Sequence, residues 1–308
     1  MSKIIRIGTR DSQLALWQAN TVKDKLEALG FKTELTPVKS TGDLILDKPL
    51  YELGITGIFT KTLDIAMING DIDIAVHSMK DVPTQLPKGI VQAAVLERAP
   101  SDDILVHKSG ENLEEDLAKN CTIATGSLRR KAQWLHRYPH HTLTDLRGNV
   151  NTRLQKLKDN NWTGAIFAKA GLERINLKPE NNIVLDWMIP APAQGAMVIA
   201  AMENDQFSRD ACSKLNHHAS EIATTIEREF LRELEGGCTA PIGALAEIKD
   251  QTIHFKGALF SLDGKRKIEV EKTIDLNKNY HFGRKCAVEI LENGGRELMA
   301  EIKSEIDK

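Results

Sequence analysis

Short β-branched segments that alternate with segments of helical apolar spacing limit most strongly what this chain can fold into. Residues 4–7 are expected to form a strand, residues 8–11 a turn, and residues 12–29 a helix with apolar side chains every three or four positions. The same succession begins again with a strand at residues 122–124 and a helix from about Leu128. Strand-to-helix units of this kind pack into mixed or parallel sheets, so the sequence predicts the α/β class.

The order of these units predicts three domains. The apolar strand expected at residues 196–201 follows a proline-containing crossing and returns to the first domain. The last part of the chain has its own helix, a Gly-Gly turn, strands near residues 242–248, 252–260 and 267–274, and a final helix, which predicts a smaller α+β domain. The predicted domains are residues 1–98 plus 197–217 for domain 1, 99–196 for domain 2 and 218–308 for domain 3.

The composition excludes several classes of protein. A chain of 308 residues with 41% hydrophobic residues has enough apolar surface for more than one core, which argues against a disordered or fibrous protein. Its longest apolar stretch, residues 195–202, is far shorter than the roughly 20 residues that a membrane helix needs. The first residues lack the pattern of a secretory signal, so the chain is expected to stay where it is made.

The cysteine and histidine spacings do not predict a metal site. The four cysteines show neither zinc-site pairing nor the density of a disulfide scaffold, which predicts reduced thiols. His140-His141 and His217-His218 are adjacent pairs, and adjacent residues on a helix do not face one ion. We therefore interpret these histidines as packing or surface residues.

Positive charge gathers in one stretch of a nearly neutral chain. Residues 121–153 contain six Lys or Arg residues and one acidic residue, Asp145. Two turns after predicted strands, residues 8–12 and 125–129, each combine hydroxyl groups with an arginine. Backbone N–H groups and the helix dipole favour anions at such turns. The pattern favours a small carboxylate or phosphate ligand in a cleft between two domains over a long nucleic acid.

Residues 73–83 join a buried strand to a loop that carries His77, Ser78, Lys80 and Asp81. Ligands of open α/β sheets bind at the carboxyl ends of strands. One interpretation places Asp81 in the cleft, where its carboxylate stabilises positive charge on a substrate nitrogen or moves a proton. The other is a solvated loop with an incidental Lys80–Asp81 pair, and the spacing alone leaves both open.

Several arginines recur beside turn residues after predicted strands. They are Arg129, Arg130, Arg147, Arg153 and Arg174. A guanidinium holds a carboxylate through two parallel hydrogen bonds and stays charged at physiological pH. Any one of these residues has an ordinary exposed face as its alternative, but their shared position after strands favours a polycarboxylate site.

Cys238 lies on a Gly-Gly turn directly after an acidic helix. The helix C-terminus, with Glu233 and Glu235 nearby, disfavours a thiolate, so the local sequence does not build an activated nucleophile. A buried inert cysteine is one interpretation. A permanent thioether, made once with a strongly electrophilic partner, is the other, and the spacing does not decide between them.

Taken together, these segments resemble the hydroxymethylbilane synthase (porphobilinogen deaminase) family from about residue 4 to the final helix. The matching runs, in order, are IGTRDSQLALWQA at 7–19, IDIAVHSMKDVP at 72–83, TGSLRR at 125–130, LRGNVNTRL at 146–154, AGLER at 170–174, AQG at 193–195 and LEGGCTAPIG at 234–243.

The resemblance implies two periplasmic-binding-protein-like domains with mixed sheets around a cleft, plus a smaller α+β C-terminal domain. It also implies that Cys238 carries a dipyrromethane cofactor as a thioether. Four porphobilinogen molecules are then added head to tail, each losing ammonia, and water releases hydroxymethylbilane. A cytoplasmic monomer that passes its product to uroporphyrinogen-III synthase is implied as well, without a nucleic-acid or membrane partner.

The resemblance further implies a role for individual residues. Asp81 matches the catalytic aspartate, which stabilises cationic pyrrole intermediates. The residues expected to bind the cofactor are Cys238, Lys80, Ser78, Ser127, Arg129, Arg130, Thr125, Arg147 and Gly148. The residues expected to bind substrate are Arg10, Ser12, Gln18, Arg153, Arg174, Gln194 and Lys61. No metal is expected.

The chain departs from the family pattern at Glu52 and Thr56, where lysine is common, while Lys61 is kept. The loss of two cations predicts altered carboxylate affinity and elongation kinetics there. Two other classes of protein compete with the enzyme. A two-lobed binding protein or ligand-sensing domain for anionic solutes would not need Cys238. A nucleic-acid-binding module would need stacking aromatics, yet aromatics are 5% of residues.

Overall fold

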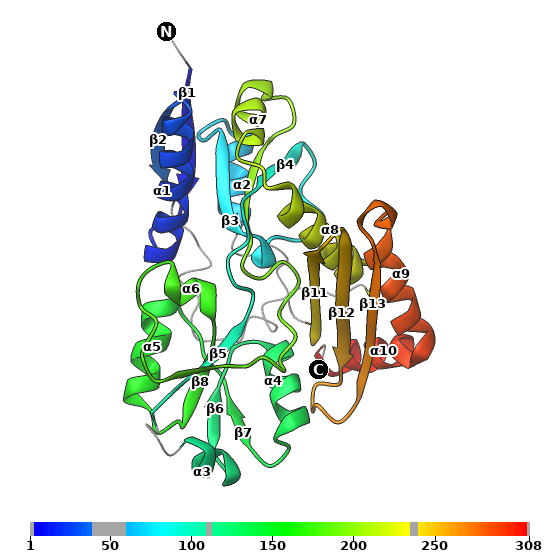
Figure 1. The fold of residues 1–308 in the computed structure, drawn as a ribbon. Coiled ribbons are helices and arrows are strands. Elements are labelled where there is room, and N and C mark those ends of the chain that lie inside the picture. The colour runs from blue at the N-terminus through cyan, green and yellow to red at the C-terminus, as the bar shows by residue number, and fades with distance from the viewer. Residues whose placement is uncertain (1–2, 39–59, 109–112, 235–239, 307–308) are drawn as a thin grey trace. The chain divides into compact units, whose positions relative to one another are not determined.

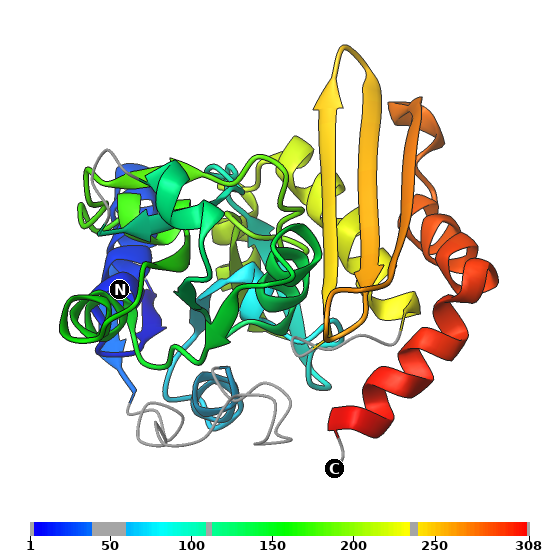
Figure 2. The same cartoon turned by 90° about the horizontal axis from the view of Figure 1, so that it is seen from below.

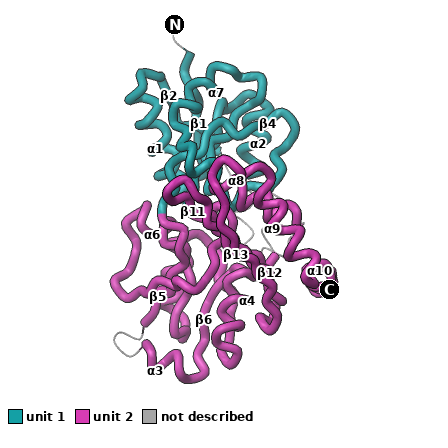
Figure 3. Tube along the Cα trace, turned by 45° about the vertical axis from the view of Figure 1, so that its right-hand side comes forward, with its two compact units in different colours: residues 1–45, 55–99, 195–222 teal, residues 46–54, 100–194, 223–308 magenta. Residues whose placement is uncertain are grey.

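The computed structural model describes residues 3–38, 60–108, 113–234 and 240–306. They divide into two compact units, shown in Figure 1 and coloured separately in Figure 3. Unit 1 takes its described residues from Met1–Ile45, Ile55–Ala99 and Gly195–Ile222, and unit 2 from Pro100–Gln194 and Ala223–Lys308. Cys238, Glu52 and Thr56 lie outside the described residues.

Unit 1 is built on a five-stranded mixed sheet of order β2-β1-β3-β10-β4. Strand β1 runs parallel to β2 and β3, whereas β10 runs antiparallel to β3 and β4. The strands are β1 (Ile4–Thr9), β2 (Lys32–Pro37), β3 (Ile74–Ser78), β4 (Ile90–Val95) and β10 (Met197–Met202). Residues 197–201 are all buried, which suits a strand with a neighbour on each side.

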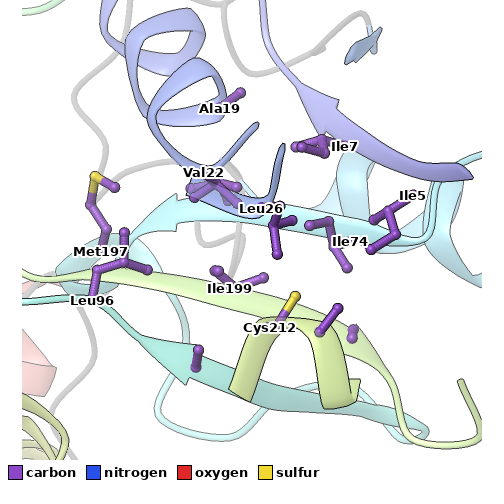
Figure 4. Close-up of a cluster of buried hydrophobic side chains, with 14 residues drawn as sticks. Ile5, Ile7, Ala19, Val22, Leu26, Ile74, Leu96, Met197, Ile199 and Cys212 are labelled. Atoms are coloured by element: carbon purple, nitrogen blue, oxygen red, sulfur yellow. The ribbon is translucent and has the colours of Figure 1, made fainter. Parts of the chain in front are cut away.

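Helices cover both faces of this sheet. Ser12 precedes α1 (Gln13–Ala28), and its Oγ accepts a hydrogen bond from Ala15 N at 3.3 Å, which caps the helix. On the other face, α2 (Lys61–Ile68) packs through Leu63 and Met67. Figure 4 shows the core between α1 and the sheet, with α7 (Gln206–Ser213) contributing Cys212. Its labelled residues are Ile5, Ile7, Ala19, Val22, Leu26, Ile74, Leu96, Met197, Ile199 and Cys212.

Unit 2 begins with a second five-stranded mixed sheet of order β7-β6-β8-β5-β9. Strand β6 runs parallel to β7 and β8, and β5 runs antiparallel to β8 and β9. The strands are β5 (Asp103–His107), β6 (Thr122–Ala124), β7 (Thr142–Thr144), β8 (Gly164–Ala168) and β9 (Asn182–Val184). The helices are α3 (Leu113–Ala118), α4 (Leu128–Arg137), α5 (Val150–Asp159) and α6 (Lys169–Glu173).

A three-stranded antiparallel sheet forms the rest of unit 2. Its strands are β11 (Ile242–Lys249), β12 (Thr252–Phe260) and β13 (Lys267–Asp275), and its helices are α8 (His218–Glu233), α9 (Phe282–Ile290) and α10 (Arg296–Ile306). Phe255 of β12 contacts Phe230 of α8 and Phe282 of α9 edge to face, at ring distances of 5.2 and 5.9 Å. Helices α8 and α9 therefore pack on this sheet, which Figure 2 shows from a second direction.

The predicted α/β class, the mixed sheets and the smaller C-terminal sheet are confirmed. The predicted final helix is present as two helices, α9 and α10, because Gly294 adopts a φ of 95° and separates them. The cleft between the first two domains stays a prediction. No helix in the described ranges is long and apolar enough to cross a membrane.

Candidate functional site

Neighbouring parallel strands bring two of the predicted segments together in unit 1. Strands β1 and β3 pair with Gly8 opposite Ala75, so their carboxyl ends lie at the same edge of the sheet. Strand β1 leads into the turn before α1, and β3 leads into a 3₁₀ turn, Met79–Asp81. Gln18 of α1 donates a hydrogen bond from Nε2 to Ser78 Oγ at 2.8 Å and links the two segments.

A small pocket of about 70 Å³ lies at this edge. The predicted residues that line it are Arg10, Ser12, Gln18, Ser78 and Asp81. The volume holds only a few water-sized groups, so it suits one carboxylate or one amino group of a larger ligand. Lys80 belongs to the same turn as Asp81. Lys61 is exposed at the first residue of α2, directly after Thr60, which also lines the pocket.

His77 lines the same pocket, although the sequence analysis gave it no role. The ring is buried, and its Nε2 has no hydrogen-bond partner among the described residues. Burial, with the nearby charge of Arg10, lowers the pKa of His77 to about 4. The imidazole is therefore neutral at neutral pH, and Arg10 supplies the positive charge of the pocket.

The arginine-bearing segments of unit 2 follow three adjacent parallel strands. Because β7, β6 and β8 are neighbours in one sheet, their carboxyl ends lie at one edge. Thr125 to Arg130 follow β6, Arg147 and Gly148 follow β7, and Arg174 ends the short helix α6 after β8. Arg130 and Arg147 are buried and Arg174 is half-buried, and burial lowers the pKa of Arg174 to about 10, so it stays charged at neutral pH.

A helix cap and a close contact between two turns determine the local structure of this edge. Ser127 Oγ accepts a hydrogen bond from Arg130 N at 3.4 Å at the start of α4. A Cβ on Gly126 would lie 2.5 Å from Leu146 O, so glycine lets the turns after β6 and β7 touch. Gly148 adopts a φ of 108°, and its carbonyl accepts a hydrogen bond from Arg153 Nε at 2.8 Å.

The strongest feature of the site is a carboxylate that the sequence analysis missed. Asp103 begins β5 opposite Ala168, the last residue of β8, and it is fully buried. Its Oδ2 accepts a hydrogen bond from Arg129 Nη1 at 2.7 Å. Its Oδ1 accepts from Arg130 Nε and from Gln194 Nε2, each at 2.9 Å. Three predicted binding residues from two distant segments therefore converge on one carboxylate.

Two guanidinium groups share this single carboxylate, so the buried cluster keeps an excess positive charge. The two guanidinium charges hold the pKa of Asp103 far below its usual range, despite burial. Burial and the neighbouring Arg130 lower the pKa of Arg129. Arg129 Nε has no hydrogen-bond partner among the described residues. The arrangement is suited to an anionic ligand, because a second carboxylate would complete the charge balance.

The described cysteines and His141 lie in buried, structural surroundings. Cys121, Cys212 and Cys286 are buried, and burial raises the pKa of Cys212 to about 12 and that of Cys286 to about 11. His141 Nδ1 accepts a hydrogen bond from Trp134 Nε1 at 3.1 Å, while its Nε2 lies 3.0 Å from Leu117 O, as the packing interpretation predicts. Within the described ranges, no group of three or more His, Cys, Asp or Glu residues is arranged to hold a metal ion.

The fold and these residues define a class of α/β protein with charged and polar side chains gathered at the carboxyl ends of parallel strands. Residues 5–210 match the family model described as "Porphobilinogen deaminase, dipyromethane cofactor binding domain", and residues 222–292 match "Porphobilinogen deaminase, C-terminal domain". The chain belongs to the porphobilinogen deaminase family. The predicted resemblance is confirmed.

Curated relatives with this name are similar over nearly their whole length. The porphobilinogen deaminase of Desulfitobacterium hafniense is 41% identical and covers 99% of each chain. Those of Syntrophomonas wolfei and Chlorobium phaeobacteroides are 40% and 39% identical, over 97% and 98% of this chain and 99% of each relative.

Solved solute-binding proteins give only low structural similarity to this chain. An ancestral cationic amino acid solute binding protein gives a TM-score of 0.43 at 14% identity, over 69% of this chain and 87% of that chain. A likeness this low adds nothing in favour of the solute-binding alternative. The match to the porphobilinogen deaminase family favours the enzyme over the solute-binding alternative.

We expect Asp103→Asn to lower the free energy of unfolding by about 3–5 kcal/mol, because it leaves two buried guanidinium groups without their shared carboxylate. Asp102→Asn is the matched control, since Asp102 is 41% exposed and lies 3.7 Å from Lys169, and it should change stability by about 0.5 kcal/mol or less. Urea unfolding of the three proteins measures the difference. A loss below about 1 kcal/mol in Asp103→Asn would contradict the assigned role of the carboxylate.

We expect His77 to make the protein less stable as the pH falls from about 6.5 to about 4. Between these pH values the unfolded chain binds a proton that the folded chain does not. The free energy of unfolding therefore decreases as the pH decreases. His77→Asn lacks the titrating group and therefore does not lose stability in this way. The free energy of unfolding of the variant, relative to the wild type, should increase by about 2–3 kcal/mol when the pH is lowered from 7.5 to 4.5.

Urea unfolding of wild type and His77→Asn at both pH values measures this change. His218→Asn, at a ring that is 81% exposed, is the control and should track the wild type. Parallel pH curves for wild type and His77→Asn would refute the buried neutral imidazole.

Proposed function

We propose that the chain is a hydroxymethylbilane synthase. In this reaction four porphobilinogen molecules condense head to tail with loss of four ammonia molecules, and one water molecule releases hydroxymethylbilane. The observation that carries the proposal is the single edge of β7, β6 and β8, where the predicted arginine segments follow the strands and Arg129 and Arg130 bond to Asp103. Cationic groups gathered in this way suit a substrate and a product that carry several carboxylates.

The residues of unit 2 fit the dipyrromethane cofactor that the family model names. Both rings of this group carry carboxylates. The cluster of Asp103 with Arg129 and Arg130 has an excess positive charge, and the buried Arg129 Nε has no partner in the part of the chain that the structure describes. The residues of unit 2 proposed to hold it are Thr125, Ser127, Arg129, Arg130, Arg147 and Gly148, and Ser78 and Lys80 of unit 1 are proposed as further cofactor-binding residues. When bound, dipyrromethane supplies the pyrrole carbon at which the chain is extended.

The residues of unit 1 are proposed to act on the incoming porphobilinogen. Asp81 accepts a hydrogen bond from the pyrrole N–H and offsets the positive charge that develops as ammonia leaves. Arg10 and Ser12, on the same pocket wall, hold a carboxylate of the substrate. The other residues proposed to bind substrate are Gln18 and Lys61 of unit 1 and Arg153, Arg174 and Gln194 of unit 2. The neutral His77 adds no competing charge beside Arg10.

Cys238 is proposed as the attachment point of the cofactor. The other three cysteines support this choice, because they are buried and their raised pKa values keep them as unreactive thiols. Glu52 and Thr56 are proposed to change carboxylate affinity relative to relatives with lysine there.

The domain division given above is proposed as well, and it is supported by the three separate sheets that the described residues form. We further propose a cytoplasmic monomer that passes its product to uroporphyrinogen-III synthase.

We expect intact mass spectrometry of the purified protein to find an adduct of dipyrromethane mass. The adduct should be absent in Cys238→Ala, which should also form no hydroxymethylbilane. Cys286→Ala is the matched control, since that thiol is buried, and it should keep the adduct. An unmodified mass for active wild-type protein would refute the tether.

Asp81→Asn removes the proposed charge-stabilising group while keeping its size. We expect fold and adduct to remain and turnover to fall at least about a hundredfold, because charge stabilisation and proton transfer in the transition state are lost. Turnover is followed by hydroxymethylbilane formation, with circular dichroism and intact mass as checks. Asp71→Asn, at an exposed site of unit 1, should match the wild type. Near-normal turnover of Asp81→Asn would exclude Asp81 from the mechanism.

A further inference from the structure

Helix α4 has a second set of partners besides the anion-binding edge. Its N-terminal turn holds Arg129 and Arg130 against Asp103. Farther along, Ala132 is fully buried in a cluster with Ile189 and with residues of the C-terminal sheet. The cluster consists of Ala132, Ile189, Ala258 and Phe260. One short helix therefore contacts both the arginine site and the sheet that follows Cys238 in sequence.

The turn between β12 and β13 packs directly on the C-terminal half of α4. A Cβ on Gly264 would lie 2.5 Å from Ala132 O and 2.6 Å from His136 N, so only glycine permits this approach. Gly264 also adopts a φ of 73°, and its carbonyl accepts a hydrogen bond from His136 Nδ1 at 2.7 Å. The ring of His136 meets Phe260 edge to face at 5.5 Å.

Hydrogen bonds among its own residues hold the turn between β12 and β13 in shape. The position of α4 is therefore passed to these strands without deformation of the turn. Asp263 Oδ1 accepts hydrogen bonds from Ser261 Oγ at 2.6 Å and from Lys265 N at 3.1 Å. Ser261 Oγ in turn accepts from Arg266 N at 2.9 Å. These bonds lower the pKa of Asp263 to about 2, so the turn keeps its charged carboxylate at any physiological pH.

A second attachment fixes the start of the C-terminal sheet. Gln133 makes two hydrogen bonds with the backbone of Ile189, at 2.8 and 2.9 Å, and Arg129 Nη1 donates to the same carbonyl at 2.8 Å. The next carbonyl, of Pro190, accepts a hydrogen bond from Ala244 N of β11 at 3.0 Å. Arg129 is thus bonded both to Asp103 and to the segment that carries β11.

We propose that the docking of Gly264 on α4 is a positioning contact for the reaction: it fixes the C-terminal sheet, and with it the start of β11 after Cys238, relative to Arg129 and Arg130. The inference rests on the proposed function, in which Cys238 holds the cofactor and these arginines hold its carboxylates. A tether attached to one element and carboxylate donors on another work together only if the two elements keep a fixed spacing. Gly264 acts through α4 and touches neither cofactor nor substrate.

The test compares two glycines that share a positive φ but differ in their surroundings. Gly264 and Gly294 both have positive φ, at 73° and 95°. A Cβ at Gly264 would meet the backbone of α4, whereas at Gly294 the nearest atom would be Ile268 Cδ1 at 3.8 Å. Gly264→Ala and Gly294→Ala therefore carry similar backbone strain, of about 1 kcal/mol, but only Gly264→Ala disturbs the docking.

We expect both variants to fold, and we expect turnover at saturating porphobilinogen to fall at least about tenfold in Gly264→Ala, equivalent to about 1.4 kcal/mol in the barrier, while Gly294→Ala stays within about twofold. The readouts are turnover, intact mass and the thermal unfolding midpoint of each full-length variant. Loss of turnover or of adduct in Gly264→Ala alone supports the inference. Turnover of Gly264→Ala within about twofold of Gly294→Ala overturns it.

A second pair of variants decides the question if Gly264→Ala does not fold. His136→Leu removes the hydrogen bond to Gly264 O, and His136→Asn keeps a donor near the position of Nδ1. Reduced turnover in His136→Leu alone supports the contact, and equal turnover in both overturns it. A wild-type protein without adduct or turnover would instead refute the proposed function, so the two failures are distinguishable.

Discussion

The ion cluster of Asp103 with Arg129 and Arg130 is the interaction on which the site depends. Burying two guanidinium groups costs several kcal/mol each unless a carboxylate and hydrogen bonds compensate them. Asp103 meets this need with both oxygens and is fully buried. Because Asp103 lies on β5 and its partners come from α4 and the segment ending at Gln194, the cluster also fixes how these elements pack.

Sheet topology explains how residues far apart in sequence reach one place. The parallel strands β7, β6 and β8 end at one edge of their sheet. The segments that follow them carry helix starts and arginines, so these lie along the same edge. The parallel pair β1 and β3 does the same in unit 1, and the bond from Gln18 to Ser78 joins its two segments. Each unit thereby offers polar groups at strand ends, which is how open α/β sheets form ligand sites.

Much of this was predictable, because it depends on local pattern. The strands at residues 4–7 and 122–124 and the helix from Leu128 follow from apolar periodicity and agree closely with β1, β6 and α4. Asp103 was not predictable in the same way, since its importance arises from antiparallel pairing of β5 with β8, which brings it to the arginines. The only local signal was an acid directly before an apolar strand. The split of the final helix depended on one glycine, Gly294, taking a positive φ.

The charge of the cluster bears on the release of product as well as on binding. Two guanidinium groups without Asp103 would hold an anion more tightly at every stage, and uniform binding of this kind lowers KM without raising kcat. With Asp103 in place, one excess positive charge remains, at a position fixed by hydrogen bonds on both oxygens. The proposed reaction lengthens a polycarboxylate chain stepwise and then releases it. A fixed and partly neutralised pair of arginines suits such a reaction, because it orients the chain without binding it so tightly that release is slow. Under the proposed function, Asp103 would therefore set how the two arginines hold an anion as well as how the elements around it pack.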